Sequence, residues 1–320
     1  MNNNSPFVSI IVPAYNCEKT ISKCLNSLLA LDYPQYEVII VDDGSTDSTP
    51  KILKDYDDKI IIIQTKNLGP SHARNIAVKQ SKGEYVAFTD SDCIVDKNWL
   101  MELFKGFGDE KVVGVGGDQL SPEDEIEFGK DVQTFMKAVG FVSDYLKTHK
   151  KIIETKHNPT CNVMYKKNVL LEVGLFDENL WPGEDVEIDL KIKKIGYKLY
   201  YNPDAIVYHY RPQNIESFSK MMKRYGWAQA YLLRKHGLFR FIQLEPFLLI
   251  ISLFLIIFFL VKNIKIGIGL LILFSLLTFV WLMIKAKNIR KGFIFITLFI
   301  RLLYYWNIGF VSYFFVGTNK

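Results

Sequence analysis

Two acidic residues separated by one serine stand out in the first hundred residues. Asp90 and Asp92 directly follow the apolar run at residues 85–89, which has the length of a short strand. On an extended segment, two carboxylates at this spacing can both reach one hard divalent cation, such as Mn²⁺ or Mg²⁺. Such a cation can also hold a diphosphate and neutralise the charge that develops when the diphosphate leaves.

Another acidic pair, Asp42 and Asp43, follows the apolar run at residues 36–41. The sequence leaves two interpretations of this pair open. Acids after a strand can face a ligand at the end of a sheet, and they can equally form a turn or cap the next helix.

A third acidic group follows a proline-glycine turn, where Glu184 and Asp185 come after Trp181-Pro182-Gly183. The apolar residues beyond them have helical spacing, so both carboxylates are predicted at a helix N-terminus, where the helix dipole favours negative charge. Acids at this position can simply cap the helix. They can also serve as the general base that accepts a proton from an attacking hydroxyl group.

The elements that would position these acids alternate between short β-branched runs and amphipathic helical stretches. Strands are predicted at residues 7–13, 36–41, 59–64 and 85–89, with helical stretches between them. This alternation predicts an α/β fold with a parallel, doubly wound sheet. Ligands of such sheets bind beyond the carboxyl ends of the strands, so both aspartate pairs are expected to face one crevice.

Four motifs, in this order, resemble those of the family 2 glycosyltransferases of the GT-A fold. The motifs are Pro13-Ala14-Tyr15-Asn16 with Glu18, Val41-Asp42-Asp43-Gly44-Ser45-Thr46-Asp47, Asn67-Leu68-Gly69 with Ala73-Arg74-Asn75, and Asp90-Ser91-Asp92. Each motif alone is a weak signal, whereas four in order at the ends of predicted strands are specific. The resemblance covers residues 7–210. It implies a GT-A type doubly wound, mainly parallel sheet and an inverting transfer of sugar from a nucleotide-sugar.

The resemblance also implies roles for individual residues. The donor-binding residues would be Pro13, Ala14, Tyr15, Asp42, Asp43, Arg74 and Asp90. Asp90 and Asp92, the DxD motif, would hold Mn²⁺ or Mg²⁺ together with His209. Asp185 would be the general base, and the acceptor side would be lined by Thr160, Asn162 and Glu184.

Structural alternatives stay open for four of these residues. Arg74 can form an ordinary surface salt bridge. A lone histidine such as His209 can simply pack against its neighbours. Thr160 and Asn162 can be buried polar residues of a strand.

The last third of the chain has a different composition. Beyond Arg240 the only acidic residue is Glu245, and apolar runs cover residues 246–261, 266–284 and 292–316. Each run can cross a bilayer core of about 30 Å as a helix, the first with help from residues 239–245. Arg301 interrupts the third run, which can instead lie at the membrane interface.

A basic amphipathic helix is predicted at residues 217–236, just before the apolar runs, and this pattern is typical of contact with a membrane surface. We therefore predict three parts: a GT-A catalytic domain at residues 1–212, an interfacial helix at 213–240, and a membrane domain of two to three transmembrane helices at 241–320. The basic loop at 285–291 predicts that it and the catalytic domain are cytosolic, in a multi-pass protein of the cell membrane. The apolar helices also offer a surface through which copies of the chain could associate.

The membrane location favours a lipid-linked acceptor, such as a polyprenyl phosphate or a lipid-linked oligosaccharide, in the assembly of a glycan or cell-surface polysaccharide. We expect one hexosyl or N-acetylhexosaminyl group to be added, with UDP favoured over GDP as the carrier nucleotide. One alternative is a processive polysaccharide synthase, although such enzymes carry a QxxRW motif where this chain has Met222-Lys223-Arg224-Tyr225-Gly226-Trp227. Another is a non-catalytic nucleotide-binding membrane scaffold, which would not need Asp90, Asp92 and Asp185.

Charge and cysteine content exclude other classes. The net charge of +5 comes without a stripe of lysine and arginine interleaved with aromatic residues, so no nucleic-acid partner is expected. The four cysteines are scattered and predict reduced thiols rather than a disulfide framework.

Overall fold

The computed structural model describes residues 5–140 and 150–316 of the chain. These residues divide into two compact units, one within Met1–Glu125 and Ser143–Tyr210 and the other within Ile126–Val142 and Arg211–Lys320. The helix α5 (Glu127–Val139) thus belongs to the second unit, although it lies inside the sequence range predicted as the catalytic domain.

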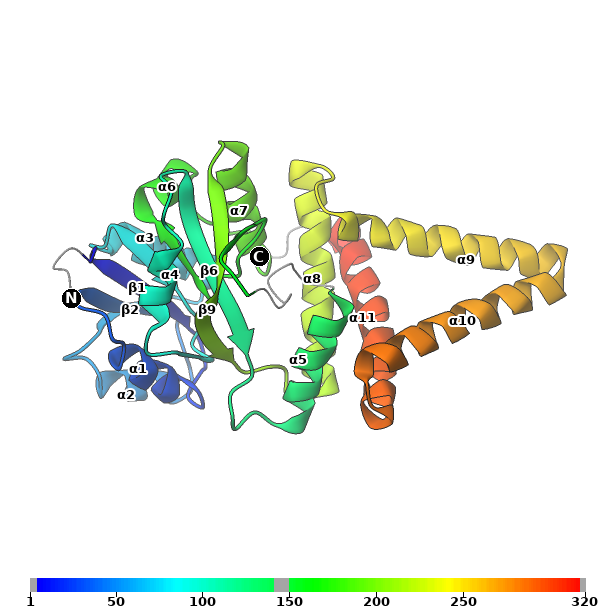
Figure 1. Cartoon of the computed structure of the whole chain (residues 1–320), viewed down its shortest axis with the longest axis horizontal. Helices are drawn as coiled ribbons and strands as arrows, with labels where there is room; N and C mark the ends of the chain where they lie inside the picture. Colours follow the sequence, from blue (N-terminus) through cyan, green and yellow to red (C-terminus); the bar gives the residue numbers. More distant parts are fainter. Residues whose placement is uncertain (1–4, 141–149, 317–320) are drawn as a thin grey trace. The chain divides into compact units, whose positions relative to one another are not determined.

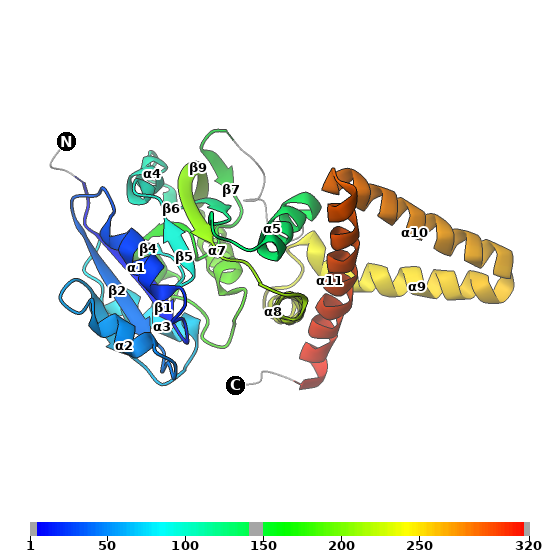
Figure 2. The ribbon, with the colours of Figure 1, turned by 90° about the horizontal axis from the view of Figure 1, so that it is seen from below.

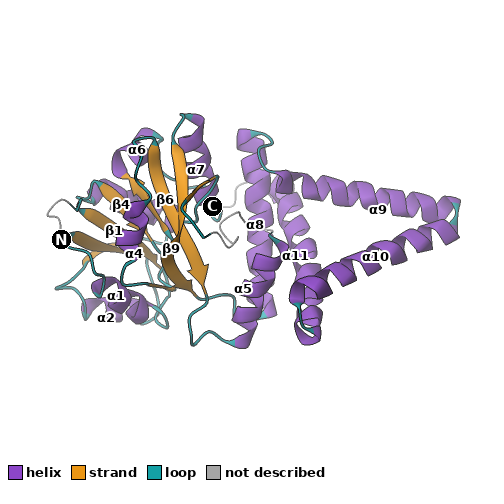
Figure 3. Ribbon diagram, viewed as in Figure 1, coloured by secondary structure: helices purple, strands orange, loops and turns teal. Residues whose placement is uncertain are grey.

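Among the described residues, the first unit is built on a nine-stranded sheet with the order β3-β2-β1-β4-β8-β6-β9-β5 and with β7 paired to β9 (Figures 1 and 3). The first half of the sheet consists of β1 (Val8–Ala14), β2 (Tyr36–Asp42), β3 (Ile61–Gln64) and β4 (Tyr85–Phe88). These strands pair in parallel. The four predicted strands and their parallel arrangement are therefore confirmed.

The second half of the sheet is mixed. β8 (Val163–Lys166) runs antiparallel both to β4 and to β6 (Val112–Leu120). β6 runs parallel to the long strand β9 (Lys198–His209). β9 also pairs antiparallel with β5 (Cys93–Val95) and β7 (Ile153–Thr155).

Helices cover both faces of this sheet, because successive side chains of a strand point to opposite faces and both faces here are apolar. On one face, Ile10 and Val12 of β1 belong to a core with α1 (Ile21–Leu29), α2 (Thr49–Lys54) and α4 (Trp99–Lys105). On the other face, Ile11 belongs to a core with α3 (Pro70–Gln80), α6 (Lys167–Glu172) and α7 (Glu184–Lys194). This double cover is the predicted doubly wound architecture.

The second unit is helical in the part that the structure describes. Its other elements are α8 (Ile215–His236), the short 3₁₀ helix η2 (Phe241–Leu244), α9 (Glu245–Lys262), α10 (Ile264–Ala286) and α11 (Ile289–Val316). α8 begins at a capping box in which Asn214 and Ser217 bond to each other's backbone. The predicted amphipathic helix is therefore present.

α8 and α11 approach each other at two glycines. A Cβ atom on Gly226 would lie 2.0 Å from the carbonyl oxygen of Trp306, and one on Gly309 would lie 1.9 Å from the carbonyl oxygen of Lys223. Any larger residue at either position would have to push the two backbones apart.

Three segments are long and apolar enough to cross a membrane: Phe241–Lys262, Ile264–Ala286 and Ile289–Phe315. α9 and α10 form a hairpin, and α11 lies transverse to this hairpin in both views (Figures 1 and 2). Along its length α11 also has a face buried in the protein, formed by Phe295, Leu298, Leu302, Trp306, Phe310 and Tyr313.

Candidate active site

The segment after β4 and the end of β9 meet, because β5 pairs with β9 and places Cys93 opposite His209. One ligand atom each from Asp90, Asp92 and His209 lies within 4.8 Å of the other two. The His209 Nε2 atom is 3.4 Å from Asp92 Oδ1. Two carboxylates and an imidazole are a donor set that suits Mn²⁺, and the carboxylates also suit Mg²⁺. The three predicted metal-binding residues thus lie together and fit such a cation.

Two thiols lie beside these donors. Cys93, Cys161 and His209 also have ligand atoms within 4.8 Å of one another, but both cysteines are buried in the core. A hydrogen bond with Cys93 lowers the pKa of Cys161 to about 6. The side chains of Asp90 and Asp92 are 29% and 46% exposed. The carboxylate set is therefore the one that a cation bound to a substrate can reach.

Arg74 of α3 connects these aspartates to the acidic group at the start of α7. Its guanidinium group donates to Asp90 Oδ1 and to Glu184 Oε1, each at 2.7 Å, and its side chain is almost fully buried. The salt bridge that the sequence left open for Arg74 therefore exists, but it lies inside the site. Burial raises the pKa of Glu184 to about 8, against the opposing effect of the Arg74 charge.

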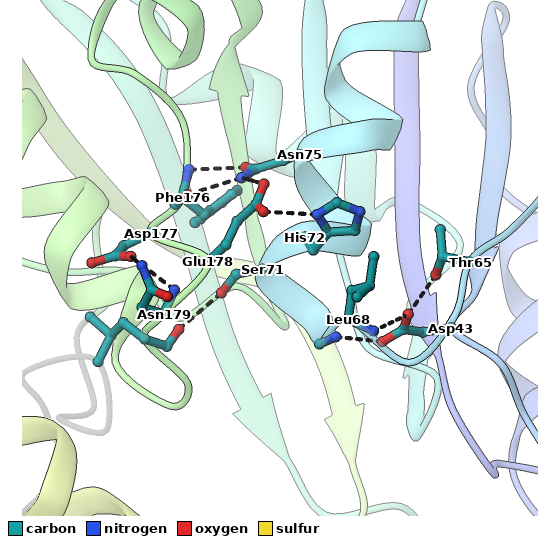
Figure 4. Close-up of polar contacts among 12 residues, drawn as sticks. Asp43, Thr65, Leu68, Ser71, His72, Asn75, Phe176, Asp177, Glu178 and Asn179 are labelled. Carbon is teal, nitrogen blue, oxygen red and sulfur yellow. Dashed lines mark hydrogen bonds and ion pairs between the residues drawn. The ribbon is translucent and has the colours of Figure 1, made fainter. Parts of the chain in front are cut away.

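The position of α3 depends on Asp43 (Figure 4). The Asp43 carboxylate accepts hydrogen bonds from the Leu68 and Gly69 backbone N–H groups at 2.8 and 2.7 Å, and from the Thr65 hydroxyl. Gly69 has a φ of 94° and directly precedes α3. Asp43 is only 3% exposed, so it acts here as the turn-forming acid that the sequence allowed.

The other side of α3 is held by residues 176–180, which lead into the proline-glycine turn. Figure 4 shows the Asn75 amide bonded to the backbone of Phe176 and to Glu178, and His72 paired with Glu178. The Ser71 hydroxyl donates to the Leu180 carbonyl oxygen at 2.9 Å. These contacts hold α3, which carries Arg74, against the segment that leads to Glu184.

Asp185 lies in the first turn of α7, as predicted. Gly183 precedes the helix with a φ of 102°, a conformation that glycine adopts without strain. The side chain of Asp185 is 19% exposed, and its Oδ2 atom lies 3.7 Å from His157 Nε2. Its Oδ1 atom accepts a hydrogen bond from the Val186 N–H group at 2.8 Å. The Asp185 carboxylate is thus partly exposed to solvent, and one of its oxygens is fixed by a backbone hydrogen bond.

A buried group of polar side chains lies beyond His157. His157 Nδ1 is 2.9 Å from Asp189 Oδ2, and Asp189 is completely buried. Asp189 also accepts hydrogen bonds from the Tyr165 hydroxyl at 2.6 Å and from the Asn158 N–H group at 2.7 Å. Burial raises the pKa of Asp189 and the pKa of Tyr165.

The other predicted residues lie at the strand ends or in the core. Ala14 is buried at the end of β1 and Tyr15, which follows it, is 46% exposed, whereas Pro13 is half-buried. The Asp42 carboxylate accepts a hydrogen bond from the Ser45 N–H group at 3.0 Å, again as a turn former.

The two polar residues predicted on the acceptor side are both buried, and Asn162 has a clear structural role. Its amide accepts from Trp99 Nε1 at 2.8 Å and donates to the carbonyl oxygens of Asp118 and Ala205 at 2.8 and 2.9 Å. Thr160 is 4% exposed. Asn162 is therefore a buried polar residue that connects three segments of the chain, which is the structural alternative that the sequence left open.

Sequence reasoning did not single out His157 or Asp189. One signal was available: Asp185 and Asp189 are four residues apart on a helix and so lie on the same face. Their negative charges repel each other unless a hydrogen-bond donor or a cation lies near them. The sequence does not show which residue provides it. His157 comes from the loop between β7 and β8 and is brought there only by the fold.

The structure is similar to that of a mannosyltransferase from Pyrobaculum calidifontis in complex with GDP-Man and Mn²⁺. The TM-score is 0.71 at 19% identity, over 98% of this chain and 89% of the other. A second solved structure, of GalNAc-T7 with UDP, GalNAc and Mn²⁺, gives a TM-score of 0.53 at 17% identity, over 74% of this chain and 52% of the other. The fold is therefore that of the GT-A glycosyltransferases.

Sequence comparison then defines the family. The chain belongs to glycosyl transferase family 2, whose model matches residues 9–174. It is 30% identical over 262 residues to the glycosyltransferase AglE of Haloferax volcanii, covering 78% of this chain and 82% of the relative. These matches confirm the family that the sequence motifs indicated, and the chain is a glycosyltransferase.

Two further relatives differ in the reaction that their names describe. A dolichyl N-acetyl-α-D-glucosaminyl phosphate 3-β-D-2,3-diacetamido-2,3-dideoxy-β-D-glucuronosyltransferase of Methanococcus voltae is 30% identical over 256 residues, covering 75% of this chain and 78% of the relative. A poly-β-1,6-N-acetyl-D-glucosamine synthase of Staphylococcus epidermidis is 29% identical over 233 residues, covering 69% of this chain and 54% of the relative.

Proposed function

We propose that this chain is an inverting, metal-dependent glycosyltransferase that moves one sugar from a nucleotide-sugar to a lipid-linked acceptor at the cell membrane. The observation that carries the proposal is the bridge made by Arg74. Arg74 pairs with Asp90 and with Glu184, the neighbour of Asp185. This supports a metal site and a base on the two sides of one buried cation.

The donor would bind on the side of Asp90. A divalent cation, Mn²⁺ or Mg²⁺, held by Asp90, Asp92 and His209 would neutralise the charge of the leaving diphosphate. Arg74 adds a fixed positive charge next to that position. The nucleotide would lie at the ends of β1 and β2, bordered by Pro13, Ala14, Tyr15, Asp42 and Asp43, with UDP favoured over GDP.

The acceptor would bind on the side of Asp185, near Thr160, Asn162 and Glu184. Asp185 takes the proton of the attacking hydroxyl group as its oxygen bonds to the anomeric carbon of the sugar. The bond between that carbon and the diphosphate oxygen breaks, and the nucleoside diphosphate leaves with the electron pair. Because the base and the leaving group lie on opposite sides, the anomeric configuration inverts.

A lipid-linked acceptor is supported by the apolar helices and by the name of the relative from Methanococcus voltae, which includes a dolichyl phosphate-linked sugar. We propose that α9 and α10 cross the bilayer and that α11 lies at its surface. α11 is transverse to the hairpin (Figures 1 and 2), and Arg301 lies near its middle. If α11 spanned the bilayer, inserting the arginine at that depth would cost about 2.5–3.5 kcal/mol of free energy. An arginine at the membrane interface avoids this cost.

A processive synthase is the second candidate, and the similarity to poly-β-1,6-N-acetyl-D-glucosamine synthases favours it. This chain spans 54% of the length of that relative from Staphylococcus epidermidis. The length of the product separates the two candidates, because a synthase yields a ladder of lengths at early times and a single-addition enzyme yields one product.

The experiment that tests the proposal is a donor and acceptor screen with the full chain in detergent. UDP- and GDP-sugars are supplied with Mn²⁺ and either polyprenyl phosphate or polyprenyl-phosphate-linked N-acetylglucosamine, and products are identified by mass spectrometry. We expect one sugar to be added to one lipid class, with loss of transfer in EDTA. Absence of transfer from every donor, with nucleotide binding intact, would support the non-catalytic scaffold instead.

A further inference from the structure

The buried polar group behind Asp185 has no part in the mechanism described so far. Asp185 and Asp189 lie one helical turn apart on α7, and the imidazole of His157 lies between them. Two carboxylates at this spacing repel each other and destabilise the helix unless a donor or cation separates them. His157 is in the position to do so.

The contacts of Asp189 define how the imidazole is held. Asp189 is completely buried and accepts from the Tyr165 hydroxyl and the Asn158 N–H group, so its third contact, at 2.9 Å, calls for a proton on His157 Nδ1. With Nδ1 bonded to Asp189, Nε2 faces Asp185 Oδ2 at 3.7 Å. The Asp189 carboxylate thereby fixes the orientation of the imidazole ring, and this orientation directs Nε2 toward Asp185.

The distance from His157 Nε2 to Asp185 Oδ2 is that of an ion pair and is too long for a hydrogen bond. Catalytic contacts are often this long without substrate and shorten in the reacting complex. The other oxygen of Asp185 is already fixed by the Val186 N–H group. With the Nδ1 proton bonded to Asp189, Nε2 donates to Oδ2 only in the imidazolium form, which has a proton on each ring nitrogen. Such a donor at Oδ2 would fix the whole carboxylate plane.

We propose that His157, oriented by Asp189, is a positioning residue that holds the Asp185 carboxylate toward the acceptor. The inference rests on the proposed role of Asp185 as the general base. Arg74, which pairs with Glu184, also acts through its charge on Tyr165 and on Asp185. Lys193 bonds to the Thr155 carbonyl oxygen at the end of β7, just before His157.

The test uses two substitutions that separate the two nitrogens of the ring. In His157→Asn the amide nitrogen replaces Nδ1 as the donor to Asp189, but the side chain does not extend to Asp185. In His157→Gln the longer amide extends toward Asp185 and gives up the bond to Asp189. Each is assayed in the full chain with the donor found in the screen and polyprenyl-phosphate-linked N-acetylglucosamine.

We expect His157→Asn to keep the wild-type melting temperature and donor KM while kcat falls about 10–100-fold, the effect of a misplaced reacting group. We expect His157→Gln to have a lower melting temperature and a higher kcat than His157→Asn. If the histidine is only structural, activity follows stability and the order of the two kcat values is reversed. His72→Asn is the matched control, because His72 also pairs with a carboxylate, Glu178, at 2.8 Å.

Asp185→Asn distinguishes a failure of this inference from a failure of the proposed base. If Asp185→Asn is inactive and His157→Asn has the wild-type kcat, the positioning role is refuted and the base assignment stands. If Asp185→Asn transfers sugar at the wild-type rate, the base assignment itself is refuted. Mn²⁺-dependent binding of UDP or GDP should be unchanged in all of these variants.

Discussion

Replacement of Arg74 by methionine tests whether the buried bridge holds the site together. Arg74 is 2% exposed and bonds to Asp90 and Glu184 at 2.7 Å each. Methionine has similar length and no charge, so Arg74→Met leaves both carboxylates without their cation while keeping most of the packing.

The expected size of the effect follows from these distances. With an effective dielectric constant of about 20, two charges about 4 Å apart attract by about 4 kcal/mol. The pair with Asp90 contributes this attraction at neutral pH, whereas the pair with Glu184 contributes it only above the Glu184 pKa of about 8. The cost of desolvating the three groups offsets much of this attraction, and removal of one member of a buried pair typically costs about 3–5 kcal/mol. Because the pKa of Glu184 is about 8 even beside Arg74, Glu184 is mostly protonated at neutral pH, and the loss on its side is correspondingly small.

The assay is thermal unfolding of the detergent-solubilised chain, followed by calorimetric titration with UDP or GDP and Mn²⁺. A loss of about 3–5 kcal/mol corresponds to a decrease in melting temperature on the order of 10 °C. Nucleotide binding should weaken as well, because Asp90 loses the group that orients it. Above about pH 8, Arg74→Met combined with Glu184→Gln should recover part of the stability lost in Arg74→Met, since no unpaired charge then remains at position 184. A melting temperature within about 2 °C of wild type in Arg74→Met would refute the reasoning.

Three further predictions concern the metal, the pH and the membrane. Asp92→Asn should weaken Mn²⁺-dependent nucleotide binding by at least about 10–100-fold in calorimetry. Asp96→Asn should not, because Asp96 follows the short strand β5 whereas Asp92 precedes it. Glu184 has a folded pKa of about 8, above its unfolded value of about 4.3. The stability that its protonated form contributes is complete below about pH 4.3 and is lost as the pH rises through about 8. The melting temperature of Glu184→Gln should lack this decline with pH. If the melting temperatures of the wild type and the variant fall equally with pH, the raised pKa of Glu184 is contradicted. If only α9 and α10 cross the bilayer, a membrane-impermeant maleimide should label Asn263→Cys in intact cells, and Phe315→Cys only after lysis; labelling of both in intact cells would show that α11 spans.

The parallel half of the sheet could be predicted because each strand is a short β-branched run next to a turn signal. β1, β2 and β3 also pair in chain order, whereas β4 pairs with β1 rather than with β3, so only the first three places in the sheet follow local succession. The mixed half has no such signal. β8 lies between β4 and β6, and β9 pairs with β5 and β7, so its order depends on contacts between distant segments.

The candidate site divides in the same way. Asp90, Asp92 and Asp185 could be predicted because each follows a recognisable strand end or turn. The function of Asp43 could not be decided from sequence, because its bonds to Leu68 and Gly69 need the fold of a loop 25 residues away. His157 was missed for the same reason, since its partner Asp189 is 32 residues further along the chain.

The close crossing of α8 and α11 has a consequence for how the chain is made. α8 ends at His236 and α11 runs to Val316, so the ribosome completes α8 long before the helix that covers it. At about 5–20 residues per second, the 80 residues between these points take about 4–16 s to synthesise. During that interval α11 has not yet been synthesised, so the face of α8 around Gly226 is uncovered. The α9–α10 hairpin is also synthesised before α11. Chains that stop before residue 289 therefore keep this apolar face of α8 uncovered.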